Sequence, residues 1–577
     1  MRRSNVRGSG AHGRPDRARE LGWDDTLYED ADAPGVPRQR GYARHPDDDS
    51  HHGPHHDGPP PGARPGGYGD GPGDGGPPPR PRRGLRIARW FFGIVAFLIL
   101  GTAAAGYLYY RELNNNLEKD PLNLGKNKLD EKQPNADGQT PLDILLLGSD
   151  SRNSDENVRL GGARADRGRK PLADVQMLLH VSADRSNMSV VSVPRDTRVT
   201  IPECTDPDDG TVYPETTTET INTSLQHGGP GCTVAAWEAM TGVSIDHFMM
   251  IDFAGVVSMA DAVGGVPVCV RDNVYDEDSG LRLEEGETTI KGEQALQWLR
   301  TRHGFEDGSD IGRTHAQHQY MNAMARQLKE GAKLSDPGKL RALAEAATNA
   351  LTVDEGLGSL KKLYDLGNDI KRVPAERITM TTMPWVPDPQ NAAHVVPNEE
   401  DAPQIWSMIR NDVAFDGKDK PKKKKPDDLV AQAEPKADIP VLVQNGTGTT
   451  MYAPVTGRAA DIAQVLVDDG FTQAATDATP KSQADTTVSY ATEEQHANAL
   501  AVAKSIGLPD RAVKQSVGVD GVTLVVGADW REGDAYPATE GGDEGEETGP
   551  EKAPESANPL AGSDKKACMD INPSYTW

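Results

Sequence analysis

The chain has few aromatic residues, few cysteines and no excess of positive charge. Aromatic side chains make up 5% of its 577 residues, four residues are cysteine, and the formal net charge is −26. The acidic balance argues against a general nucleic-acid-binding protein, which normally carries a basic surface. The cysteines form no Cys-x-x-Cys motif or Cys/His cluster, so a zinc site is not expected. At this length the chain should contain several modules.

One long apolar run contains no charged residue, and it extends from Trp90 to Tyr110. About 20 helical residues span the core of a bilayer, so the length fits a transmembrane helix, which we place at 87–110. The run starts far from the N-terminus and lacks the layout of a cleavable signal peptide. Basic residues precede it, namely Arg82, Arg83, Arg86 and Arg89. The positive-inside tendency therefore predicts a single-pass membrane protein with its N-terminus in the cytoplasm and its C-terminus outside.

Composition divides the remaining chain into segments. Gly, Pro and charged residues dominate both ends, which is typical of disorder. We expect a disordered cytoplasmic arm at 1–86, an extracellular stalk at 111–140, a main domain at 141–412 with its core at 141–330, a Lys-rich linker at 413–437, a second domain at 438–530 and an acidic disordered tail at 531–577.

Strand-like and helical patterns alternate in the main domain. Apolar strands are predicted at 142–147, 175–181 and 188–193, and helices at 232–240, 253–263, 292–299 and 314–329. Such alternation predicts an α/β domain with α-β-α layers. The second domain repeats the alternation on a smaller scale, so a small α/β fold is expected there.

Charged side chains gather at the ends of the predicted strands. Asp150 follows the first strand, Asp174 precedes the second, and Arg195 follows the third. Carboxylates at strand ends can hold a hard divalent cation. Several arginines at one place suit a pyrophosphate, because guanidinium groups match phosphate oxygens in a bidentate geometry. Arg300 and Arg302 follow the 292–299 helix, and further along the chain Arg313 lies one helical turn before Gln317.

The order and wording of these segments resemble the LytR-CpsA-Psr family, whose members are membrane-anchored bacterial enzymes that attach glycopolymers to the cell wall. The resemblance covers about 140–330, and 438–530 resembles the LytR C-terminal domain of many actinobacterial members. It implies that Asp150 and Asp174 bind Mg²⁺. Our full assignment of pyrophosphate-binding residues is Arg195, Arg198, Asn222, Arg300, Arg302, Arg313 and Gln317, and that of catalytic residues is Asp150, Asp174, Arg195, Arg302 and Arg313. Asn222 could instead only brace its loop.

The resemblance implies a phosphotransferase that moves an anionic glycopolymer, of the teichoic acid kind, from a polyprenyl-pyrophosphate carrier to a hydroxyl of peptidoglycan. Phosphoryl transfer depends mainly on positioning and charge neutralisation, which Mg²⁺ and the arginines would supply. A polyprenyl chain needs an apolar groove, although ordinary core packing explains the apolar residues of the main domain equally well. The alternatives are a non-catalytic scaffold that binds polyprenyl pyrophosphates, and a pyrophosphatase. A role as transcriptional regulator is disfavoured, because the large domains would lie outside the cytoplasm.

Two positions depart from the family pattern and would reduce the phosphate-binding charge. Leu172 stands where many members have an Arg before the second aspartate, and Ala316 stands where many have an Arg before Gln317. The loop before Leu172 offers three possible substitutes for the first of these, which are Arg164, Arg167 and Arg169.

The cysteines lie in two different settings. Cys204 and Cys232 flank a polar, Thr-rich insert and could form a disulfide outside the membrane. Cys269 lies in an apolar strand pattern and Cys568 lies in the tail. We expect the latter two to be free thiols.

Overall fold

The computed structural model describes residues 83–577 except for 127, 136, 162–166, 332–336, 420–432, 450–451, 517, 538–551, 563 and 565–566. The expected cytoplasmic arm therefore lies outside the described residues up to position 82. The same is true of much of the expected linker and of part of the expected acidic tail.

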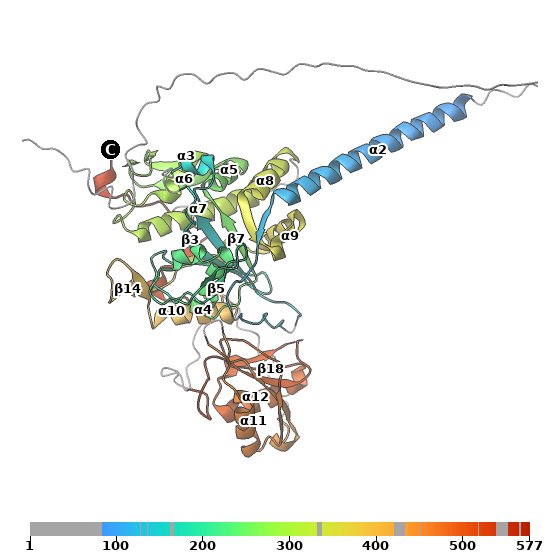
Figure 1. Cartoon of the computed structure of the whole chain (residues 1–577), viewed down its shortest axis with the longest axis vertical. Coiled ribbons are helices and arrows are strands. Elements are labelled where there is room, and N and C mark those ends of the chain that lie inside the picture. Colours follow the sequence, from blue (N-terminus) through green and yellow to red (C-terminus); the bar gives the residue numbers. More distant parts are fainter. Residues whose placement is uncertain are drawn as a thin grey trace, which may run out of the picture. The chain divides into compact units, whose positions relative to one another are not determined.

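The N-terminal part of the described chain is one long helix, α2 (Arg83–Asn116), which is drawn in blue in Figure 1. It is long and apolar enough to cross a membrane from Arg89 onward. Its large apolar side chains are exposed, for example Trp90 and Phe97, each at 75%. A row of exposed apolar side chains is unfavourable in water and is typical of a surface that contacts lipid or protein. The chain from Leu108 onward forms a second unit.

The second unit is built on an eight-stranded mixed sheet with the order β1-β12-β7-β2-β3-β4-β13-β21. Strand β2 pairs antiparallel with β3 and parallel with β7, while β4 pairs antiparallel with β3 and parallel with β13. Residues 118–120 of the expected stalk instead form the edge strand of this sheet. The strands are β1 (Glu118–Asp120), β2 (Leu142–Ser149), β3 (Ala173–Val181), β4 (Met188–Ser192), β7 (His247–Ile251), β12 (Leu351–Asp354), β13 (Ile378–Thr382) and β21 (Leu560–Ala561).

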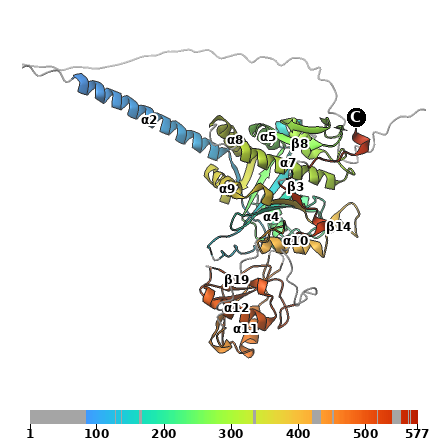
Figure 2. The same cartoon turned by 180° about the vertical axis from the view of Figure 1, so that it is seen from behind.

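Helices cover both faces of the main sheet, which confirms the predicted α-β-α layering. Alternate residues of β3 point to opposite faces, so Leu178 packs in one core and Met177 in the other. On one face lie α4 (Pro230–Thr241) and α10 (Asp401–Arg410), and on the other lie α5 (Phe253–Ala262), α7 (Asp310–Gly331), α8 (Pro337–Ala350) and α9 (Leu360–Arg372) (Figure 1, Figure 2). Because β3 is buried on both faces, its sequence reads as a nearly continuous apolar run.

Two small antiparallel sheets of two strands each and a short helix complete this part of the molecule. They pack with α7 around the buried side chains of Trp298 and Phe305. The strands are β8 (Val266–Val270) with β11 (Gly286–Ile290), and β9 (Val274–Asp276) with β10 (Leu281–Leu283), and the helix is α6 (Glu293–Arg300). Elsewhere in the domain the short elements are α3 (Asp155–Arg159), β5 (Cys204–Thr205), β6 (Val212–Tyr213), β14 (Trp385–Pro387) and β15 (Val395–Pro397).

The second domain is a small α/β unit with its own core. Its five-stranded sheet has the order β17-β16-β20-β18-β19. Phe471 and Trp530 are fully buried in this core. The elements are β16 (Pro440–Asn445), α11 (Arg458–Asp468), β17 (Gln473–Asp477), β18 (Thr487–Tyr490), α12 (His496–Ile506), β19 (Val513–Gln515) and β20 (Val522–Val526).

One disulfide confirms an expectation, and the other corrects one. Cys204 pairs with Cys232, as expected, with a Cα–Cα distance of 5.9 Å. The prediction of free thiols at Cys269 and Cys568 is wrong, because these two residues form a second disulfide. The expected disorder of the tail is also corrected in part, since Leu560–Ala561 form β21 of the main sheet. Composition suggested disorder because the tail is acidic and rich in Gly and Pro, and the surface that orders β21 is distant in sequence.

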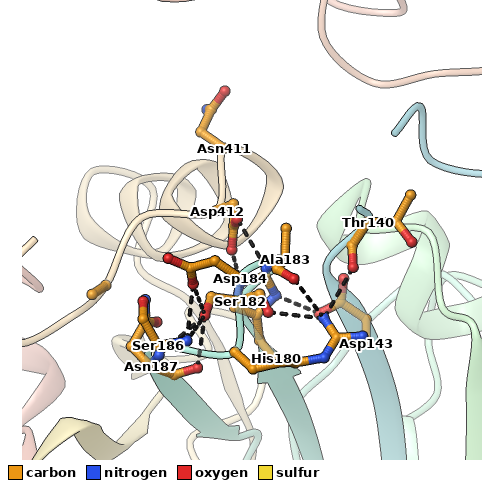
Figure 3. Close-up of polar contacts among 12 residues, drawn as sticks. Thr140, Asp143, His180, Ser182, Ala183, Asp184, Ser186, Asn187, Asn411 and Asp412 are labelled. Carbon is orange, nitrogen blue, oxygen red and sulfur yellow. Dashed lines mark hydrogen bonds and ion pairs between the residues drawn. The ribbon is translucent and has the colours of Figure 1, made fainter. Parts of the chain in front are cut away.

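A buried charged network closes one end of the β2–β3 pair (Figure 3). His180 is fully buried between two carboxylates, with Nδ1 2.8 Å from Asp143 Oδ1 and Nε2 3.1 Å from Asp412 Oδ1. Lys132 Nζ donates to Asp143 Oδ2 at 2.7 Å. Burial disfavours the charged imidazolium, but the attraction and hydrogen bonds of Asp143 and Asp412 outweigh it and raise the pKa of His180 to about 9.

This network predicts a pH-dependent stability. The folded pKa of His180 lies above its ordinary value of 6.5, so its stabilisation is complete below pH 6.5 and is lost as the pH rises through 9. The free energy of unfolding should fall by roughly 3 kcal/mol over this window. The measurement is chemical denaturation of the wild type and of His180→Gln at several pH values. Parallel pH profiles for the two proteins would contradict the assignment.

Candidate active site

The charged residues singled out in the sequence lie at one edge of the main sheet. Ser149 of β2 pairs with Ala173 of β3, so the end of β2 lies beside the start of β3. Ser192, the last residue of β4, pairs with Met177 of β3 and reaches the same edge. The carboxyl ends of β7 and β13 lie there too, because they run parallel to β2 and β4. In open α/β sheets, ligands bind at this kind of edge.

Asp150 lies directly after β2 and is almost fully buried, at 4% exposed. Its Oδ1 accepts a hydrogen bond from the backbone N–H of Leu172 at 2.6 Å, and its Oδ2 forms an ion pair with Arg169. Arg152 Nη2 lies 3.9 Å from the same Oδ2. A register shift between Gly148 and Ser149 precedes Asp150, and such irregularities are common next to active sites.

Asp174 and Arg195 face each other across the β3–β4 pair. Arg195 Nη1 donates to Asp174 Oδ1 at 3.2 Å, and Arg195 Nε lies 3.5 Å from Asp196 Oδ2. Both side chains are partly accessible, at 31% for Asp174 and 23% for Arg195. Asn222 donates its backbone N–H to the Arg195 carbonyl at 3.3 Å. Its side-chain oxygen accepts from Thr220 Oγ1 at 2.7 Å, so Asn222 braces the Arg195 turn.

Arg300, at the end of α6, belongs to the same site. Its Nη1 donates to the Leu160 carbonyl at 2.9 Å, and its guanidinium lies 5.3 Å from the ring centroid of Phe253. Burial and the neighbouring charge of Arg152 lower the pKa of Arg300, while Asp174 acts in the opposite direction. Gly161 has a φ of +147°, and a Cβ at that position would overlap the Arg300 guanidinium. The approach of Arg300 therefore requires glycine there.

The other assigned residues are placed differently. Arg198 is held by other side chains, with its Nε 2.7 Å from Asp388 Oδ2 and its Nη1 donating to Gln390, and its assignment to pyrophosphate binding stays a prediction. Arg302 is exposed in the loop after α6. Arg313 is half-buried one turn before Gln317 on α7, and Gln317 is 6% exposed.

The sequence analysis did not assign Arg152 to the site. It also left open which of Arg164, Arg167 and Arg169 substitutes for the arginine that is missing at Leu172. Arg169 forms the ion pair with Asp150, whereas Arg167 pairs with the exposed Asp155. Arg164 lies outside the described residues. Arg169 thus supplies positive charge next to the position of Leu172. The spacing alone could not choose Arg169, because the choice depends on the path of the loop before β3.

The departure at position 316 has a structural explanation. Ala316 is fully buried in the core around α6 and α7, and its carbonyl accepts a hydrogen bond from Trp298 Nε1 at 2.9 Å. The side chain at this position packs against that core, so a small residue suits it. Two positions further on, His318 is hydrogen-bonded to Ser192 at the end of β4. Burial lowers the pKa of His318 to about 3, so the ring is neutral and links α7 to the strand that precedes Arg195.

The layered fold brings aspartates and arginines together at one end of the main sheet. The LytR_cpsA_psr family model matches residues 107–411, and the model described as LytR cell envelope-related transcriptional attenuator matches 438–530. The first match covers more than half of the chain. The chain therefore belongs to the LytR-CpsA-Psr family and carries a LytR C-terminal domain.

Curated relatives are similar over large parts of their length. The chain is 28% identical to the cell wall biosynthesis protein LcpA of Corynebacterium glutamicum, over 76% of this chain and 86% of that protein. It is 28% identical to the polyisoprenyl-teichoic acid–peptidoglycan teichoic acid transferase TagU of Bacillus cereus, over 43% of this chain and 73% of that protein.

Solved structures give weaker matches. The LytR-Csp2A-Psr enzyme from Actinomyces oris is 23% identical, with a TM-score of 0.37 over 51% of this chain and 95% of that chain. The TagV protein of B. subtilis is 21% identical, with a TM-score of 0.37 over 48% of this chain and 97% of that chain.

The Arg169–Asp150 ion pair predicts a difference between two neighbouring arginines. Arg169→Ala leaves the buried Asp150 carboxylate with only the more distant Arg152 as an ion-pair partner, so it should lower the free energy of unfolding by about 1–3 kcal/mol. Arg167→Ala removes an exposed pair and should change it by less than about 1 kcal/mol. Denaturant titrations at neutral pH measure both. Equal effects would contradict the role given to Arg169, and adding Leu172→Arg to Arg169→Ala should recover part of the loss.

Proposed function

We propose that this protein is a membrane-anchored phosphotransferase that moves an anionic glycopolymer from a polyprenyl-pyrophosphate carrier to a hydroxyl of peptidoglycan. The observation that carries the proposal is the meeting of Asp150, Asp174, Arg195 and Arg300 at one sheet edge. Family membership supports it, as do the printed names of the curated relatives, which include teichoic acid transferases. The apolar span of α2 supports the membrane anchor.

Asp150 and Asp174 fit an Mg²⁺ ion whose other ligands are waters and substrate phosphates. Among the described residues, no group of three or more His, Cys, Asp and Glu side chains could hold a metal ion. Mg²⁺ usually binds through one or two carboxylates together with waters and substrate phosphates, which two aspartates at neighbouring strand ends can provide. Asp150 and Asp174 would hold the ion. When bound, it would neutralise pyrophosphate charge and polarise a phosphoryl oxygen.

The arginines act as a fixed electrostatic environment. Arg195 is held by Asp174 and Asp196, and Arg300 is held by the Leu160 carbonyl, so neither guanidinium has to be ordered when the substrate arrives. A buried guanidinium is poorly solvated and interacts strongly with an incoming phosphate. Donors fixed where negative charge develops stabilise the transition state. Arg195 and Arg300 would thus bind the pyrophosphate and stabilise the departing lipid phosphate.

The face of the main sheet that carries Met177 would contact the carrier lipid. On this face Val175, Met249 and Met321 are only partly buried. They come from β3, β7 and α7. Val175 directly follows Asp174, so partly exposed apolar side chains there would suit the polyprenyl chain of a ligand with an anionic head.

The placement of Arg169 also bears on the alternatives. A non-catalytic scaffold was suggested by the missing arginines at positions 172 and 316. Arg169 provides a guanidinium next to Asp150, and Ala316 packs in a core. The departures therefore give no reason to prefer a scaffold.

The test is a transfer assay with full-length protein in detergent, a polyprenyl-pyrophosphate-linked saccharide and peptidoglycan fragments. Asp150→Asn and Asp174→Asn should each lower the transfer rate by at least about 100-fold, the size found for donors that stabilise developing charge. Chelation should abolish transfer, and added Mg²⁺ should restore it. Asp155→Asn is the matched control, because Asp155 is exposed and lies in the same region.

The assay separates the competing functions. Attachment of the saccharide to peptidoglycan supports the transferase. Release of the saccharide phosphate to water, at the same rate with and without peptidoglycan, would identify a pyrophosphatase. Tight binding of the donor with no turnover in either condition would identify a scaffold, and wild-type rates for both aspartate variants would refute the metal site.

The orientation in the membrane follows from the basic residues before the span. Arg86 and Arg89 precede Trp90, and the positive-inside tendency puts them in the cytoplasm. The second unit would then lie outside, where the two disulfides are stable. A phosphatase reporter that is active only outside the cytoplasm should be active when fused after Asn116. Activity of a cytoplasm-specific reporter at this position would refute the orientation.

A further inference from the structure

The C-terminal tail returns to the main domain after the second domain. Strand β21 pairs with β13, the Cys568–Cys269 disulfide joins residues 299 positions apart, and the Met569 backbone N–H donates to the Cys269 carbonyl at 2.9 Å. Met569 and Ile571 are 1% and 8% exposed, and both belong to the core around Trp298. Nothing in the proposed reaction uses these contacts directly.

The tail holds the loop between α6 and α7, which contains Arg302. The backbone N–H of Gly304 donates to Asp276 Oδ2 at 2.9 Å on one side of the loop. On the other side, the backbone N–H of Glu306 donates to the Asp570 carbonyl at 2.9 Å, and that of Asn572 donates to the Gly304 carbonyl at 3.1 Å. Glu306 has a φ of +47°, which a non-glycine residue adopts only when its surroundings impose it.

The tail also contacts Phe305 and His303 in this loop. Phe305 is fully buried against Trp298, with 4.8 Å between ring centroids, and its backbone bridges to Ile571. The ring of Tyr575 stacks on His303, the residue after Arg302.

A second chain of contacts reaches α7. Asn558 Nδ2 lies 3.2 Å from His315 Nε2, and His315 Nδ1 lies 2.8 Å from Glu306 Oε1. His315 is thus held between the tail and the loop, two positions after Arg313.

We propose that the tail, residues 555–577, is a positioning element of the active site that fixes Arg302 and Arg313 for the pyrophosphate of the substrate. Asn558, Asp570 and Asn572 are positioning residues, because they act through the loop and through His315. The proposal rests on the proposed function. Its physical basis is that a loop without regular structure loses conformational entropy when it binds a ligand, and tail contacts made beforehand remove much of that cost.

The tail can be cut from the full-length protein after folding, and the Cys269–Cys568 disulfide decides whether the cut tail stays attached. A specific protease site replaces residues 541–547 of the full-length protein, in one version with native cysteines and in another with Cys269→Ser and Cys568→Ser. After cleavage, the native version keeps its tail through the Cys269–Cys568 disulfide, whereas the double-serine version can lose it. The Cys204–Cys232 disulfide stays intact in both, because no reductant is used. The uncleaved double-serine protein shows whether that version folds.

Hydrogen exchange gives a readout that does not depend on the reaction. Amide protons of 303–306 should exchange at least tenfold faster in the cleaved double-serine protein than in the cleaved native version, while those of β2 and β3 should not change. A synthetic 552–577 peptide should reverse the effect. Unchanged exchange in the loop after release of the tail would overturn the proposal, whether or not the protein transfers glycopolymer.

Kinetics test the link to the arginines. Release of the tail should lower kcat/KM for the donor at least tenfold, and the peptide should restore it. Arg302→Ala should lower the rate strongly when the tail is present and by less than threefold when it is absent, because the tail acts through Arg302. An equal cost of Arg302→Ala in both forms would refute the positioning role. If the intact protein transfers nothing, the proposed function fails while hydrogen exchange still decides the placement of the loop.

Discussion

The register of β2 against β3 determines where charge lies in this molecule. At one end the register pairs Asp143 with His180 and closes the strands with a buried ionic network. At the other end it places Ser149 beside Ala173, so Asp150 and Asp174 emerge together. A shift of one residue would send every side chain of β2 to the opposite face of the sheet and separate Asp143 from His180. The register therefore maintains the geometry of the polar crevice.

More positive than negative side chains lie close to Asp150 and Asp174. The repulsion between the arginines costs free energy, and neighbouring groups offset part of that cost. Arg300 lies near Arg152, and both burial and that like charge disfavour its charged form. The Leu160 carbonyl, the ring of Phe253 and the charge of Asp174 compensate. A clustering of like charges such as this is expected to favour an anionic ligand, as the proposed function requires.

Much of the fold and part of the site could be predicted from the sequence. The strands of the main domain were recognisable because β3 and β4 are mostly apolar, and Asp174 and Arg195 were recognisable because they lie next to the apolar residues of these strands. The contacts of Arg198 could not be predicted, because a sequence does not show that Asp388, nearly 200 positions away, is its ion-pair partner. The choice of Arg169 over Arg167 depends on a loop path that periodicity does not encode. Local patterns predict elements, whereas ion pairs between distant segments require the assembled fold.

The tail shows why composition alone fails for some segments. Residues 552–577 form a short segment whose apolar side chains are interspersed with Pro, Asn, Lys and Asp, so they could not form a core in isolation. They become ordered because Met569 and Ile571 enter a core that other elements have already formed, and because a disulfide keeps Cys568 beside Cys269. A covalent tether raises the effective concentration of a weakly binding segment, so modest contacts suffice. The second domain is thus inserted between two segments that both contribute strands to the main sheet.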